Sequence, residues 1–196
     1  MSEININEET TTETPKNKIA KEIVEYIEIF VFALCFVILT FSFFFRLCTV
    51  SGSSMENTLL DKEALIVSDL FYTPERYDIV VAHDTNTLNE PIVKRVIATE
   101  GETVNISYSD DTMTVSITDK DGNVSVLEED YIKYDYQKFY RDQEYTVPEG
   151  KVFLMGDNRN DSLDSRSSEV GCVDTRSILG KVVFRITPFS KIGAVK

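Results

Sequence analysis

Histidine is nearly absent from this chain, which has only His83 among its 196 residues. No cluster of metal-ligand residues and no glycine-rich nucleotide loop is present, so we expect no metal and no cofactor. Positive charge is also scarce: 20 lysines and arginines stand against 33 acidic residues, for a net charge of -13. Because such an acidic chain repels nucleic acid, we expect no nucleic-acid partner.

Cysteine is scarce as well. Cys35 lies inside an apolar run, Cys48 just beyond it, and only Cys172 falls in the main polar part of the chain. Three residues placed in this way do not form a disulfide framework, so we expect the domain to fold without disulfides. Roughly 150 residues remain outside the apolar run and its flanking tail, enough for one domain with a sizeable core.

A long hydrophobic run is present near the N-terminus. Residues 29–45 carry no charge, and at about 1.5 Å per residue they cover about 26 Å, the short end of a bilayer span. Ile27, Leu47 and Val50 can extend the run, and Tyr26 is placed for a membrane interface. We predict a membrane anchor over residues 25–48, preceded by a tail over residues 1–24.

Two alternatives to a retained anchor fit this run less well. A cleavable signal peptide has an apolar region of about 7–15 residues and a small-residue cleavage site, whereas this run is longer and Arg46 follows it. A lipoprotein anchor at Cys48 is disfavoured because Arg46 and Leu47 precede that cysteine, where small residues are expected. A retained anchor is therefore favoured.

The orientation of the anchor follows from its basic flanks. Lys16, Lys18 and Lys21 precede the run, whereas Arg46 and Lys62 follow it. Lysine and arginine set topology while acidic residues contribute little. We therefore place the N-terminus in the cytoplasm and residues 49–196 outside, in a single-pass protein of the cell membrane.

The chain beyond residue 50 is predicted to be mainly β. Short runs rich in β-branched residues alternate with turn residues, and no stretch shows helical periodicity for more than about two turns. Residues 102–147 are acidic and tyrosine-rich, which suggests a β insertion. Within it, Asp121-Gly122 predicts a hairpin between residues 116–118 and 124–126. The runs that predict strands in the flanking parts are 64–67, 77–81, 92–97 and 181–186.

A serine and a lysine are the candidate chemical groups. A serine hydroxyl needs a neighbouring base before it is a good nucleophile. His83 could serve by count, but it follows a strand-like run into a polar loop, where a solvated histidine is the simpler interpretation. Lysine can replace histidine only if burial lowers its pKa from about 10.4 toward about 7–8. Lys94 has the required apolar neighbours, residues 91–93 and 96–97.

Strand alternation places Lys94 and its neighbour Arg95 on opposite faces. We expect one of the two side chains to point inward and the other to stay in water. From the strand context alone, an ordinary exposed strand lysine is the favoured interpretation of Lys94.

Four sequence blocks, taken in order, reverse that preference. They resemble the blocks of the type I (leader) signal peptidases, which remove signal peptides from exported proteins. Asn57 departs from the family pattern, which usually has proline there, and Glu102 replaces the usual aspartate of a Gly-Asp pair. The resemblance extends from the anchor to residues 188–193, and residues 102–147 match it poorly. The blocks are residues 51–59, 76–81, 94–97 and 155–166.

The resemblance implies a coiled β-sheet catalytic domain with one N-terminal transmembrane helix. It also implies a serine endopeptidase in which Ser54 is the nucleophile, Lys94 the general base and Ser162 the group that orients the lysine. The backbone N–H of Ser54 is the candidate oxyanion donor. The substrate would be a preprotein held as an extended strand, with small residues before the cut. The implied bracing charges are two pairs, Asp164 with Arg166 and Asp157 with Arg159, and the implied substrate contacts are Met55, Gly52, Ile92 and Val93.

Two other functions are compatible with parts of this pattern. Self-cleaving repressors of the DNA-damage response also use a serine-lysine dyad, but the anchor and the acidic charge oppose a soluble DNA-binding protein. An inactive, membrane-anchored relative that serves as an assembly factor for surface structures is the second alternative. Such a protein could lose Ser54 or Lys94 freely, and the presence of both argues against it.

Overall fold

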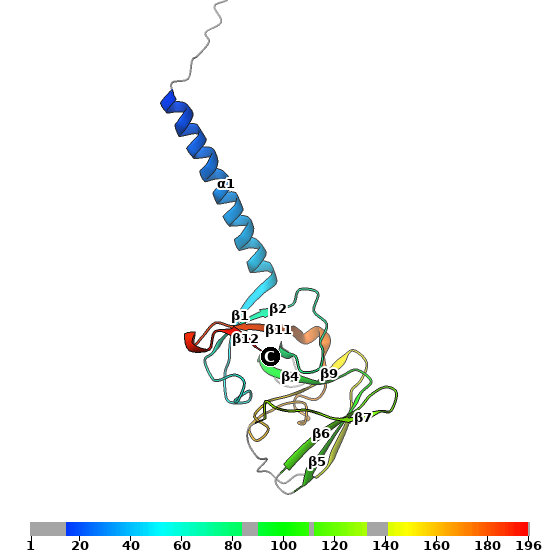
Figure 1. Cartoon of the computed structure of the whole chain (residues 1–196). Coiled ribbons are helices and arrows are strands. Elements are labelled where there is room, and N and C mark those ends of the chain that lie inside the picture. Colours follow the sequence, from blue (N-terminus) through cyan, green and yellow to red (C-terminus); the bar gives the residue numbers. More distant parts are fainter. Residues whose placement is uncertain (1–14, 84–89, 110–111, 133–140, 196) are drawn as a thin grey trace, which may run out of the picture. The chain divides into compact units, whose positions relative to one another are not determined.

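The computed structural model describes residues 15–83, 90–109, 112–132 and 141–195. It divides the chain into two units, residues 1–43 and residues 44–196 (Figure 1). The predicted tail lies outside the described residues over 1–14, and the predicted insertion lies outside them over 110–111 and 133–140.

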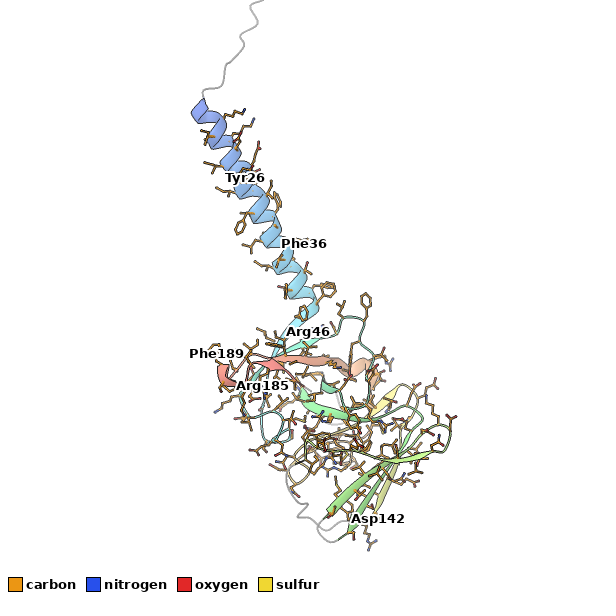
Figure 2. The ribbon with its side chains drawn as sticks, in the orientation of Figure 1. Tyr26, Phe36, Arg46, Asp142, Arg185 and Phe189 are labelled. Atoms are coloured by element: carbon orange, nitrogen blue, oxygen red, sulfur yellow. The ribbon has the colours of Figure 1, made fainter. Side chains whose placement is uncertain are left out.

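A single long helix, α1 (Pro15–Phe44), makes up the described part of the first unit. Eighteen consecutive residues within its segment Lys18–Phe44 have a mean hydropathy of 2.5, and the length and composition of this segment suffice to cross a membrane. Apolar side chains project from it on all sides, Tyr26 and Phe36 among them (Figure 2). The apolar side chains on every side of this segment are exposed, so the helix has no soluble core to face.

The helix ends earlier than the predicted anchor. Residues 45–48 belong to strand β1 (Phe45–Thr49), where the backbone pairs in register with β2 (Ala64–Ser68). Arg46 forms an ion pair with Asp69 at 3.3 Å. Because strand pairing satisfies the backbone of residues 45–48, these residues follow the sheet instead of the helix.

The second unit is built on a large antiparallel sheet with the order β1-β2-β11-β3-β4-β9-β10, and β12 pairs with β11. Strand β3 is buried on both faces, which explains its unbroken apolar sequence. The remaining strands of this sheet are β3 (Ile79–Ala82), β4 (Ile92–Thr99), β9 (Lys151–Met155), β10 (Val173–Asp174), β11 (Ile178–Arg185) and β12 (Gly193–Ala194). Two 3-10 turns, η1 (Thr175–Ser177) and η2 (Phe189–Lys191), flank β11.

A second sheet has the order β7-β6-β5-β8. It comprises β5 (Thr103–Ser109), β6 (Thr112–Thr118), β7 (Val124–Val126) and β8 (Gln143–Thr146). The predicted hairpin is confirmed, since residues 116–118 pair with residues 124–126, and Asp119 accepts backbone bonds within the connecting loop. Figure 1 shows β5, β6 and β7 beyond β4 and β9, at the opposite end of this unit from β1 and β2. In Figure 2, Asp142, which accepts a bond from the Tyr108 backbone, marks that end.

Two buried clusters position the functional loops. One joins the second sheet to the first, packing residues of β5 and β6 such as Ile106 and Ile117 against Phe153 and Met155 of β9. The other places Met55 and Leu59 under the strands β2, β3 and β11. The first cluster fixes the second sheet against β4 and β9, and the second anchors the loop that carries Ser54. The predicted mainly β fold with one N-terminal helix is confirmed.

Candidate active site

Ser54 lies in the loop that joins β1 to β2. The base of this loop is closed by backbone bonds between Val50 and residues 62–63. Directly after Ser54 the chain makes a helical turn, in which the Leu59 backbone N–H donates to the Met55 carbonyl at 2.8 Å. The Met55 and Leu59 side chains are 1% and 0% exposed. Ser54 lies between the closed loop base at Val50 and the buried Met55. Because both of these points are held in place, the position of Ser54 is fixed.

Lys94 of β4 reaches this serine from the sheet. Its Nζ lies 2.6 Å from Ser54 Oγ, within hydrogen-bond distance, and also donates to the Val93 carbonyl at 3.1 Å. Lys94 is 4% exposed. Burial lowers its pKa from 10.5 to about 8, a shift that the charges of Asp164 and Asp157 partly oppose and that of Arg166 reinforces. Half of Lys94 is therefore neutral at about pH 8, and a smaller fraction at neutral pH, and the neutral amine can accept a proton.

One expectation about this strand is wrong. Lys94 is buried, as a general base requires, but Arg95 is only 2% exposed, so neither of the two side chains stays in water. Arg95 donates to both carboxylate oxygens of Asp157, at 2.9 and 2.7 Å, and to the Tyr77 carbonyl at 2.8 Å. Residues 94–98 of β4 are all buried, so both faces of the strand are covered there, and the arginine is buried as an ion pair.

The loop that follows β9 holds the backbone on both sides of the Ser54 side chain. The Asn158 backbone N–H donates to the Ser54 carbonyl at 3.0 Å, and its side-chain amide donates to the Ser53 carbonyl at 3.2 Å. Ser53 Oγ donates in turn to Asp161 at 2.6 Å. This loop therefore fixes the main chain at the nucleophile.

Ser162 does not make the contact with Lys94 that its implied role requires. Its Oγ donates to Asp164 Oδ2 at 2.7 Å, and in the described part of the chain Lys94 Nζ bonds Ser54 Oγ and the Val93 carbonyl but not Ser162. Asp164 also accepts from the Gly156 backbone at 3.0 Å and from the Arg166 guanidinium. Burial raises the pKa of Asp164, but these hydrogen bonds outweigh it and hold the pKa below its usual value.

One of the two implied pairs of bracing charges forms, and the other does not. Asp164 pairs with Arg166 at 2.8 Å, as expected. Asp157 pairs with Arg95, and Arg159 pairs instead with Glu129. Sequence reasoning missed Glu129, since its acidic segment resembles any solvated loop.

Two further residues were missed in the same way. Thr58 Oγ1 donates to Asp157 Oδ2, and the ring of Tyr131 lies 4.0 Å from the Arg95 guanidinium carbon. Burial raises the pKa of Tyr131, with the nearby Glu129 charge as a second cause. The tyrosine-rich composition of this region was its one visible signal.

The residues implied as substrate contacts have different surroundings. Met55 is a core residue and is not accessible to a peptide. Gly52 has a φ of 88°, and its backbone N–H donates to Asp61 Oδ1 at 2.9 Å. Ile92 and Val93 are half-buried. The ladder between β4 and β9 begins at Arg95, so residues 92–94 extend past the end of β9.

His83 follows the end of β3 and is half-buried. Its backbone N–H donates to the Ser177 carbonyl at 2.8 Å. The group in hydrogen-bond contact with Ser54 Oγ is the amine of Lys94. The geometry therefore favours lysine over histidine as the base.

The chain is similar to known signal peptidases over most of its length. The family model described as signal peptidase, peptidase S26, matches residues 23–187. Signal peptidase IB of Staphylococcus aureus is 33% identical over 183 residues, covering 87% of this chain and 93% of the relative. Signal peptidase I of Streptococcus pneumoniae is 32% identical over 197 residues, covering 84% and 93%. A crystal structure of a signal peptidase I from Enterococcus faecalis V583 has 31% identity and a TM-score of 0.44, covering 57% of this chain and 98% of that one. This chain belongs to the signal peptidase family, peptidase S26.

Proposed function

We propose that this protein is a membrane-anchored serine endopeptidase that removes N-terminal signal peptides from exported preproteins, with Ser54 as nucleophile and Lys94 as general base. Family membership supports the reaction and the class of substrate. The observation that carries the assignment of residues is the 2.6 Å contact between Ser54 Oγ and a buried lysine whose pKa is about 8.

The reaction proceeds in two steps. Neutral Lys94 takes the proton of Ser54 Oγ as this oxygen attacks the scissile carbonyl carbon, and the resulting ammonium then protonates the leaving amine of the mature protein. The signal peptide remains bound to Ser54 as an ester. Lys94 next takes a proton from a water molecule that attacks the ester, and Ser54 leaves with that proton.

The tetrahedral intermediates need a donor aimed at the developing oxyanion. The backbone N–H of Ser54 is our candidate. The Ser53 hydroxyl donates to Asp161, so it is engaged elsewhere. The substrate would lie as an extended strand beside residues 92–94, beyond the point where β9 ends, and main-chain hydrogen bonds would hold it there.

The membrane placement is also part of the proposal. Helix α1 anchors the chain in the bilayer, with the N-terminus in the cytoplasm and residues 49–196 outside, where exported precursors emerge. Protease added to intact spheroplasts should then digest the second unit, and disruption of the membrane should not be needed. Protection of that unit in intact spheroplasts would contradict the orientation.

The mechanism is tested with the full chain in detergent micelles and an exported precursor as substrate. Ser54→Ala and Lys94→Ala should each abolish cleavage while the protein still inserts into membranes, and His83→Ala should retain it. Normal cleavage by Lys94→Ala, with loss in His83→Ala, would overturn the dyad. Absence of cleavage by the unaltered protein would favour the inactive assembly factor.

A further inference from the structure

The segment that leaves the second sheet after β7 packs into the first sheet. Leu127 is buried in the core shared by the two sheets, and its backbone N–H donates to the Val115 carbonyl at 2.9 Å. Two residues on, Glu129 bonds the Arg159 guanidinium through both of its carboxylate oxygens, at 3.1 Å to Nη1 and with a shorter bond to Nη2. The two side chains are 12% and 4% exposed, so this ion pair is nearly dry.

Tyr131 joins the same contact. Its hydroxyl donates to Glu129 Oε1 at 2.8 Å and accepts from Arg159 at 3.4 Å. Its ring covers the guanidinium of Arg95, with 4.0 Å from the guanidinium carbon to the ring centre. Tyr131 therefore contacts Arg95, the neighbour of Lys94, and both Glu129 and Tyr131 contact Arg159 of the loop after β9.

Three guanidinium groups beside the dyad each need a carboxylate in this buried region. Arg166 has Asp164, and Arg95 has Asp157, both in the loop after β9. Of these three, Arg159 is the one whose counter-ion, Glu129, comes from the second sheet's connection between β7 and β8. Without Glu129, a buried cation would stand uncompensated two residues from Asp157.

A short chain of contacts leads from this ion pair to the nucleophile. Arg159 Nε donates to the Gly156 carbonyl at 3.0 Å, which fixes the turn over residues 156–159. Within that turn the Asn158 backbone N–H donates to the Ser54 carbonyl at 3.0 Å. A shift of the turn would thus move the Ser54 main chain relative to Lys94.

We propose that Glu129, supported by Tyr131, is a positioning residue for the reaction: it holds Arg159, and through the 156–159 turn it fixes Ser54 against Lys94. This gives the second sheet a part in catalysis. The inference rests on the Ser54–Lys94 dyad proposed above. Attachment of the second sheet does not depend on the ion pair, since the shared apolar core already joins the two sheets.

The test uses the full chain in detergent micelles with a signal-peptide-bearing precursor, and kcat and KM are measured separately. Glu129→Gln should lower kcat about tenfold to a hundredfold through misplacement of the nucleophile, with KM changed less than about twofold because no substrate contact is removed. Glu128→Gln is the matched control, since Glu128 is exposed and has no ion pair in the described structure. The kcat and KM of Glu128→Gln should match those of the unaltered protein.

A double variant separates positioning through Arg159 from any independent effect. Glu129→Gln and Arg159→Gln break the same pair, so the double variant should be no slower than the slower of the two single variants. Multiplied losses would contradict the proposal, as would normal kcat in Glu129→Gln or a loss confined to KM.

If Glu129→Gln does not fold, Tyr131→Phe decides. It keeps the ring over Arg95 and removes only the hydroxyl that holds Glu129. A reduced kcat at unchanged KM supports the proposal, and an unchanged kcat overturns it. If the Ser54–Lys94 dyad itself were wrong, a different variant would reveal it: Lys94→Ala would keep full activity.

Discussion

A lysine that acts as a base must lose its proton near neutral pH, although a free lysine holds it to about pH 10.4. In this protein the cause of the shift is burial: Lys94 lies in a strand covered on both faces, and only Ser54 Oγ and the Val93 carbonyl accept from its Nζ among the described residues. Asp157 and Asp164 lie close enough to oppose the shift. Each of them is held by an arginine, which limits its pull on the lysine proton.

The pH dependence of cleavage follows from this lysine. Only neutral Lys94 can take the serine proton, so kcat/KM should fall as the pH drops below about 8, the pKa of Lys94, by about tenfold per pH unit. Above pH 8 it should reach a plateau. The measurement is the initial rate of precursor cleavage between about pH 6 and about pH 10. A rate that stays level down to the acidic end of this range would contradict lysine as the base.

At the scale of elements, the loop after β9 is the part that assembles the site. Gly156 marks the closest approach in it: a Cβ there would collide with Ser162 Oγ and with the Ser54 carbonyl oxygen. A side chain at position 156 is therefore excluded from both sides: by Ser162 of the loop after β9 and by Ser54 of the β1–β2 loop. The Ser54 carbonyl cannot easily move away from such a Cβ, because it also accepts a hydrogen bond from the Asn158 backbone N–H.

Gly156→Ala should therefore disturb the dyad without removing any chemical group. We expect cleavage to fall about a hundredfold or more, as for other misplacements of about 1 Å. Gly122→Ala provides a comparison, because Gly122 lies in the β6–β7 loop and a Cβ added there would meet no atom within 4 Å. It should cost some stability, since its φ is 86°, but leave kcat unchanged. Equal losses of kcat in the two variants would contradict a steric effect at the site.

At the scale of the whole molecule, the chain separates anchoring from chemistry. The described part of the first unit is one apolar helix, whereas every residue of the proposed site belongs to residues 44–196. The second unit has its own buried clusters. The helix would thus act by confining the enzyme to the surface where its membrane-held substrate lies, which raises the effective concentration of each for the other.

Removal of residues 1–43 should accordingly leave a folded second unit that still cleaves a short soluble peptide. Cleavage of a precursor embedded in vesicles should fall at least about a hundredfold, because the two molecules no longer share a surface. Vesicle flotation and parallel kinetics on the two substrates provide the measurement. Equal losses on both substrates would show instead that the helix is needed for the fold.

The local sequence was enough for the anchor helix, the mainly β fold and the hairpin over residues 116–126, because each depends on a short-range pattern. The residues of the dyad were named from motif blocks by resemblance, since strand context alone favoured an exposed lysine. The conformation of Asn57 was not predictable from the resemblance. Its φ is 102°, which the proline that usually stands there in the family cannot adopt, because a proline ring holds φ near about −65°.

The amino-acid sequence by itself determined which elements form and which groups are available for chemistry. Only the tertiary structure decided which of these groups meet: Lys94 with Ser54, Arg95 with Asp157, and Arg159 with Glu129. The resemblance suggested that Asp157 would pair with Arg159, and strand alternation suggested that either Lys94 or Arg95 would stay in water. Both failed for one physical reason, namely that pairing of buried charges is set by the packing of distant strands, which leaves no local pattern in the sequence.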